Sequence, residues 1–181
     1  MKFFSTNKFI IILYFILIIP SIIFGQNKKE PPCSVKEAYQ FDFWIGKWDL
    51  HWTTKSGKTA YDKNEIKSFL DGCVIHENYT TIDAYPFVGK SYSVYNISKK
   101  QWEQTWVDNS GGYMTFTGEF KNGKMMLSRN VHGKDGKQII QRMVFYNISK
   151  DKIDWDWEMS KDKGKTWNLK WRIYYKRHKK S

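Results

Sequence analysis

The sequence has few residues that break secondary structure and none of the periodicity that marks a long helix. It contains 4 prolines and 12 glycines in 181 residues, which is not the composition of a disordered chain. Beyond residue 34, apolar residues do not recur with the 3.6-residue period of an amphipathic helix. We therefore expect almost no helix, except for one short segment at 34–39.

Motifs of the common catalytic and metal sites are missing too. The sequence has no serine-centred elbow, no glycine-rich phosphate loop, no paired-cysteine motif and no His-x-x-x-His pair. We therefore assign no catalytic residue, no metal site and no cofactor. Asp154, Asp156 and Glu158 alternate along one segment, and we interpret them as a solvated outer face opposite Trp155 and Trp157.

Long apolar runs are scarce, and the one present lies at the N-terminus. Lys2 and Lys8 precede an apolar run at 9–19, which Pro20 ends before the small residue Gly25. This layout predicts a secretory signal peptide over 1–25, hence export to the periplasm or the outside. An uncleaved anchor is the alternative. No second apolar run approaches the length of a bilayer span.

Acidic residues are outnumbered by basic ones. The chain has 18 Asp and Glu against 30 Lys and Arg, a formal net charge of +12. Most lysines lie in predicted turns, and export argues against nucleic acid as a partner. The basic tail, 177–181, predicts at most a weak attraction to anionic surfaces.

What the sequence has in quantity is aromatic residues, 18% of the chain, placed in alternating patterns. Alternation of this kind predicts half-buried strands, and turn signals recur about every ten residues between them. The predicted strands are 43–53, 60–69, 73–82, 89–97, 101–108, 113–120, 124–132, 137–147, 152–159 and 166–176. Ten such strands favour an all-β, antiparallel, up-and-down β-barrel, because closure removes exposed edges. A sandwich is the alternative.

The first strand carries Gly46-Lys47-Trp48, a Gly-x-Trp box. This resembles the calycin barrels, namely lipocalins, fatty-acid-binding proteins and the nitrobindin-like group. More closely, FDFWIGKWD, DGC, GKSYSVYN and QWEQTWVDNSGG resemble secreted bacterial proteins of uncharacterised function with a calycin-like barrel. The resemblance implies that Trp48 plugs the closed end of the barrel under an arginine, either Arg172 or Arg177, of which Arg172 is the first choice. The expected organisation is a signal peptide (1–25), a linker (26–40), the barrel (41–176) and the tail (177–181).

The two cysteines, Cys33 and Cys73, are an even pair in a chain expected to be exported. In the meander, Cys73 begins the third strand at the end of the barrel where the first strand also begins, and Cys33 precedes that first strand. A disulfide is therefore expected, with two buried thiols as the alternative.

If Trp48 points inward, alternation predicts which other side chains line the interior. The candidate ligand-binding residues are Trp48, Glu77, Gln104, Trp106, Asp108, Arg129, Trp155 and Trp157. Aromatic walls with a few polar groups suit a small hydrophobic or amphipathic ligand, bound without catalysis.

Two other functions stay open at this point. One is a structural or interaction module of the envelope with a filled interior. The other is a hydrolase or isomerase that uses carboxylates such as Glu77 and Asp108. The sequence does not indicate which ligand is bound or the oligomeric state.

Overall fold

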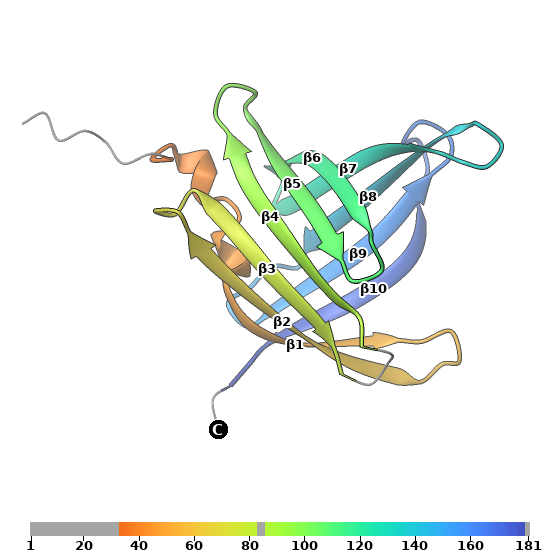
Figure 1. Ribbon diagram of the computed structural model, residues 1–181, viewed down its shortest axis with the longest axis horizontal. Coiled ribbons are helices and arrows are strands. Elements are labelled where there is room, and N and C mark those ends of the chain that lie inside the picture. Colours follow the sequence, from red (N-terminus) through yellow and green to blue (C-terminus); the bar gives the residue numbers. More distant parts are fainter. Residues whose placement is uncertain (1–32, 83–85, 180–181) are drawn as a thin grey trace, which may run out of the picture.

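Ten antiparallel strands form one closed barrel in the computed structural model, which describes residues 33–82 and 86–179 (Figure 1). Each strand pairs with its neighbours in sequence, and the last pairs with the first. The strands are β1 (Gly46–Thr53), β2 (Thr59–Phe69), β3 (Val74–Thr81), β4 (Val88–Asn96), β5 (Gln101–Asp108), β6 (Tyr113–Lys121), β7 (Lys124–His132), β8 (Gln138–Tyr146), β9 (Lys152–Ser160) and β10 (Asn168–Arg177). The expected signal peptide, 1–25, lies outside the described residues.

The predicted up-and-down barrel is confirmed, and each strand lies within three residues of its predicted bounds. The largest difference is at the first strand, which begins at Gly46 and not at residue 43. Before it come two short 3-10 helices, η1 (Lys36–Tyr39) and η2 (Asp42–Trp44). The chain turns there because Phe41 and Trp44 pack across the end of the barrel, where both are almost completely buried.

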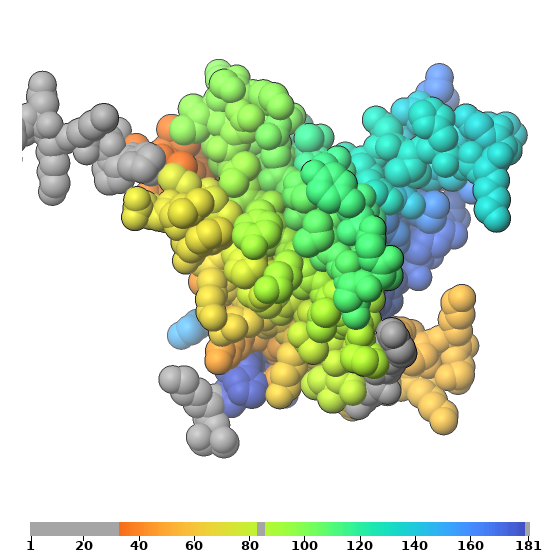
Figure 2. Space-filling model, viewed as in Figure 1, coloured from red at the N-terminus to blue at the C-terminus, as the bar shows by residue number. Residues whose placement is uncertain are grey.

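The two ends of the barrel differ. η1 and η2 lie at the same end as the β2–β3 and β4–β5 turns, and this end is closed (Figure 1). At the opposite end the β1–β2 and β7–β8 hairpins project separately and leave a recess between them (Figure 2). Among the described residues, no helix is long and apolar enough to cross a membrane.

The predicted disulfide is confirmed. Cys33 and Cys73 are bonded, with their Cα atoms 5.3 Å apart. The bond ties the segment before η1 to the turn that begins β3, at the closed end of the barrel. A disulfide indicates a location outside the cytoplasm.

Trp48 closes this end of the barrel from the inside. Its side chain is 1% exposed, and its indole N–H donates to the carbonyl oxygen of Trp44 at 2.7 Å. The guanidinium of Arg177 lies over the indole, 3.7 Å from the ring centroid. Arg177 also donates to the carbonyl oxygens of Ile45 at 2.6 Å and Lys150 at 3.0 Å. The last strand is thereby bound to the segment that precedes the first.

The first choice for this arginine, Arg172, was wrong. Arg172 lies between Trp171 and Ile173 on β10, so alternation turns it outward, where its Nη2 lies 2.6 Å from a carboxylate oxygen of Asp156. Arg177, placed in the tail by the sequence, is instead the last residue of β10.

Glycine is required at position 46 for two reasons. Its φ is +132°, which disfavours a side chain. A Cβ there would also lie 2.1 Å from Nη1 of Arg177. In the Gly-x-Trp box, Gly46 therefore provides the backbone bend and the space for Arg177, and Trp48 provides the indole beneath the guanidinium.

Arg177→Ala should lower the free energy of unfolding by about 3 kcal/mol, because it removes a cation–π contact and the donor to the partly buried carbonyl oxygen of Ile45. Urea unfolding followed by tryptophan fluorescence measures this. Lys176→Ala, at the exposed neighbouring residue, is the control and should change stability by less than about 0.5 kcal/mol. Equal effects of the two substitutions would show that the stack does not hold the barrel end.

Reduction of the disulfide should lower the free energy of unfolding by about 4 kcal/mol, since the bond spans 40 residues of sequence. Unfolding with and without reductant measures the change, and the Cys33→Ala, Cys73→Ala double variant should not respond to reductant. Two titratable thiols in the denatured, unreduced protein would contradict the bond.

Candidate functional site: an aromatic cavity inside the barrel

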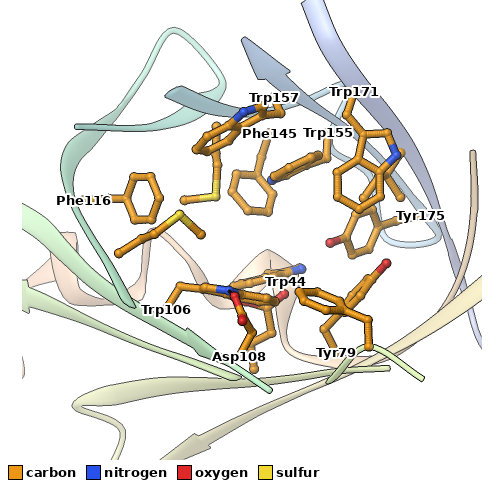
Figure 3. A pocket seen from close by; sticks show the side chains of 15 residues that line it. Trp44, Tyr79, Trp106, Asp108, Phe116, Phe145, Trp155, Trp157, Trp171 and Tyr175 are labelled. Atoms are coloured by element: carbon orange, nitrogen blue, oxygen red, sulfur yellow. Dashed lines mark hydrogen bonds between the residues drawn. The ribbon is translucent and has the colours of Figure 1, made fainter. Parts of the chain in front are cut away.

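A cavity of about 310 Å³ lies inside the barrel on the open side of Trp44 (Figure 3). Ten of its lining side chains are aromatic rings. The lining residues are Trp44, Glu77, Tyr79, Phe87, Trp106, Asp108, Met114, Phe116, Met143, Phe145, Trp155, Trp157, Trp171, Ile173 and Tyr175.

Alternation on the strands places these rings. Trp155 and Trp157 are two residues apart on β9, so both face inward and their rings lie nearly parallel, with centroids 6.4 Å apart. Trp171 on β10 meets Trp155 edge to face at 5.6 Å. Phe116 on β6 meets Trp157 in the same way at 5.8 Å. The rings support one another, and this fixes the shape of the wall.

One polar cluster in the cavity wall is centred on Glu77 of β3. Its carboxyl group accepts hydrogen bonds from the Asn64 amide at 2.7 Å and from the Ser91 hydroxyl at 2.6 Å. The Asn64 amide also donates to the Tyr175 hydroxyl at 3.3 Å. Burial raises the pKa of Glu77 to about 7, although the two donors oppose the shift.

A second polar cluster joins Tyr79 to Asp62. The Tyr79 hydroxyl donates to Oδ2 of Asp62 at 2.6 Å, and the Trp52 indole N–H donates to the same oxygen at 2.6 Å. Burial and the hydrogen bond to Asp62 raise the pKa of Tyr79, so it stays a phenol. Asp62 is 2% exposed but does not line the cavity. Its carboxyl group therefore contacts the cavity wall through the Tyr79 hydroxyl.

A third polar group, Asp108, lies at the end of β5. One carboxylate oxygen accepts from the backbone N–H groups of Ser110 and Gly112, and the other accepts from the Trp106 indole at 2.9 Å. These donors, with the Ser110 hydroxyl, lower the pKa of Asp108 to about 2, so it is ionised. The absence of a side chain at Gly89 leaves room for the Trp106 indole, because a Cβ at position 89 would lie 2.0 Å from a carbon of that ring.

Five of the eight candidate binding residues line the cavity: Glu77, Trp106, Asp108, Trp155 and Trp157. The other three do not. Trp48 is packed at the closed end beneath Arg177. Gln104 is buried in the wall, where its amide donates to the Ser93 hydroxyl. Arg129 donates to the Gln141 side chain at 2.7 Å and does not reach the lining.

The remaining lining residues are not among the eight candidates. Met114 and Phe116 on β6, like Met143 and Phe145 on β8, follow the same alternation as the selected residues, so inward parity applied to every strand would have found them. Phe87 precedes β4, and no local pattern marks it.

The acidic residues of β9 lie opposite Trp155 and Trp157 as predicted, but the face is not fully solvated, because Asp156 is only 5% exposed. Asp156 pairs with Arg172, Glu158 pairs with Arg142 at 2.6 Å, and Asp154 accepts from Asn147. Within 33–82 and 86–179, no three acidic, histidine or cysteine residues are grouped as metal ligands would be.

The buried carboxyl group makes stability depend on pH. Glu77 has a folded pKa of about 7, above its ordinary value of 4.5, so between these values unfolding releases a proton that the native state retains. Stability should therefore fall as pH rises from 5 to 8, by an amount on the order of 3 kcal/mol.

In Glu77→Gln this loss should vanish, because the amide carbonyl can accept from Asn64 while its NH₂ donates to Ser91. Urea unfolding at both pH values compares the variant with wild type. Glu119→Gln, on an exposed side chain, should leave the pH dependence of wild type intact. A Glu77→Gln variant with the pH dependence of wild type would contradict a buried, neutral Glu77.

No protein-family model matches the chain, and no curated protein matches it. Among solved structures it is similar to a redesigned beta barrel, with a TM-score of 0.41 and 11% identity over 81% of this chain and 98% of that one.

Proposed function

We propose that the protein binds a small hydrophobic or amphipathic molecule inside its barrel and does not transform it. The observation that supports this is the cavity itself, about 310 Å³ in volume and lined mostly by aromatic rings. Ligand sites typically have volumes from about 300 Å³ upward and combine apolar walls with a few placed polar groups. Glu77, Asp108 and the hydroxyls of Tyr79 and Tyr175 are such groups.

The two alternative functions have less support. A packed interior would leave no cavity of this size among the rings. An acid–base pair needs a carboxylate free to exchange protons with a substrate, whereas the oxygens of Asp108 are engaged by Ser110, Gly112 and Trp106.

We also propose that the barrel is of the calycin type. The supporting features are the Gly-x-Trp box on β1 and the guanidinium of Arg177 over Trp48. Export through the N-terminal segment 1–25 is part of the same proposal, and the Cys33–Cys73 disulfide is consistent with it.

Binding can be tested with N-phenyl-1-naphthylamine, an uncharged fluorescent probe whose emission rises in apolar sites. We expect saturable binding to the wild-type protein. Met143→Trp should weaken it roughly tenfold or more, because Met143 lines the cavity and the larger ring would occupy part of it.

Met126→Trp is the matched control. Met126 lies between the buried residues Met125 and Leu127 on β7, so it faces outward and is absent from the lining. Its substitution should leave probe binding unchanged. Equal binding by both tryptophan variants would place the probe outside the barrel and contradict the proposal.

A further inference from the structure

We propose that the ligand is an organic cation, an ammonium group carried on an apolar body, held by the carboxyl groups and ring faces of the cavity. This rests on the proposed function and specifies the chemical class of the ligand. Neither the composition of the chain nor its net charge suggests it, since a strongly basic protein is expected to attract anions.

The charge of the cavity lining differs in sign from that of the whole chain. The chain contains 30 Lys and Arg, yet the described residues that line the cavity include no lysine, arginine or histidine. They do include two carboxyl groups, on Glu77 and Asp108. A third, on Asp62, lies directly behind Tyr79. The described lining therefore carries two acidic groups and no basic one.

The aromatic rings of the lining also favour a cation. Five of the lining residues are tryptophans, whose faces attract cations more strongly than those of tyrosine or phenylalanine. Trp155, Trp157 and Trp171 form one wall, and Trp106 faces them across the cavity with Tyr79 beside it (Figure 3). A cation between these walls would lie among indole rings from both sides, and exclusion of water strengthens the attraction.

The hydrogen bonds of two lining side chains favour a positively charged head as well. The Tyr79 hydroxyl gives its proton to Asp62, and the Trp106 indole gives its proton to Asp108. Both donors are thus used within the protein, and the Tyr79 oxygen retains lone pairs that can accept from a ligand. A positively charged head therefore complements the carboxyl groups and the Tyr79 oxygen, whereas the indole N–H groups of Trp44 and Trp171 have no acceptor among the described residues and are free for an acceptor atom on the body of the ligand.

Within the part of the chain that the structure describes, Arg129 is a basic side chain that contacts a lining residue. It lies 5.5 Å from the centroid of the Phe116 ring, but its Nε donates to Gln141 and it does not line the cavity. An anionic ligand held by Arg129 is therefore the alternative that the experiment has to separate.

The proposal can be tested with three probes that share a phenyl ring and differ in the charge of the attached group. They are the cation benzyltrimethylammonium, the neutral 2-phenylethanol and the anion 3-phenylpropionate. Each is titrated into the full mature protein at pH 8 by calorimetry, with quenching of tryptophan fluorescence excited at 295 nm as a second readout. We expect benzyltrimethylammonium to bind roughly tenfold or more tightly than 2-phenylethanol, and 3-phenylpropionate to bind most weakly.

Variants then locate the cation. Glu77→Gln should weaken the binding of benzyltrimethylammonium roughly tenfold. It should leave the binding of 2-phenylethanol unchanged, because that head carries no charge. Glu119→Gln, a matched loss of charge on the outer surface, should affect neither probe. Arg129→Gln should not weaken the binding of benzyltrimethylammonium. Urea unfolding shows whether each variant is folded.

The outcomes separate this inference from the proposed function. If the cation is preferred and Glu77→Gln removes the preference, the inference is supported. If the phenyl probes bind but the alcohol or the carboxylate binds as tightly as the cation, the inference is wrong and the binding function stands. If neither these probes nor N-phenyl-1-naphthylamine bind, both proposals fail.

Discussion

The contact between Arg177 and Trp48 is the constraint on which the rest of the barrel depends. The guanidinium covers the indole at 3.7 Å and donates to backbone carbonyls at Ile45 and Lys150. It therefore joins the end of β10 to the start of β1 at the point where the sheet closes. With the disulfide at the same end, the closed end is fixed by side chains and by a covalent bond. The open end can consequently leave its interior unfilled.

Much of the fold follows from local properties of the sequence. A period of two is set by each strand alone, so alternation was enough to predict ten strands and to place Glu77, Trp106 and Trp155 inside. The same rule, applied to β10, already excludes Arg172 from the interior, because it lies between the inward residues Trp171 and Ile173. That error came from choosing a residue by its type and ignoring its parity.

The cavity could not be predicted in the same way, because depth along the barrel is not a local property. Gln104 and Trp106 have the same parity on β5, yet Gln104 is buried in the packed wall and Trp106 lines the cavity. The boundary between the two is set by Trp44, which leaves the strand pattern and lies across the interior (Figure 3). Long-range packing of this kind produces no periodic pattern in the sequence. Phe87 also lines the cavity from outside a strand, so alternation does not place it either.

The interior polar groups are the part of the structure that stability alone does not explain. Glu77 is 6% exposed, and the ionised form of a carboxyl group is expensive at such a site. An apolar residue packed between Asn64 and Ser91 would leave their donors unsatisfied, so the cluster has to be kept or removed as a unit. A barrel selected only for packing has no reason to keep it, since replacing such a cluster with apolar side chains is often neutral or stabilising. A site that holds a charged ligand head does have a reason, because the cost in the free protein is offset when the ligand binds.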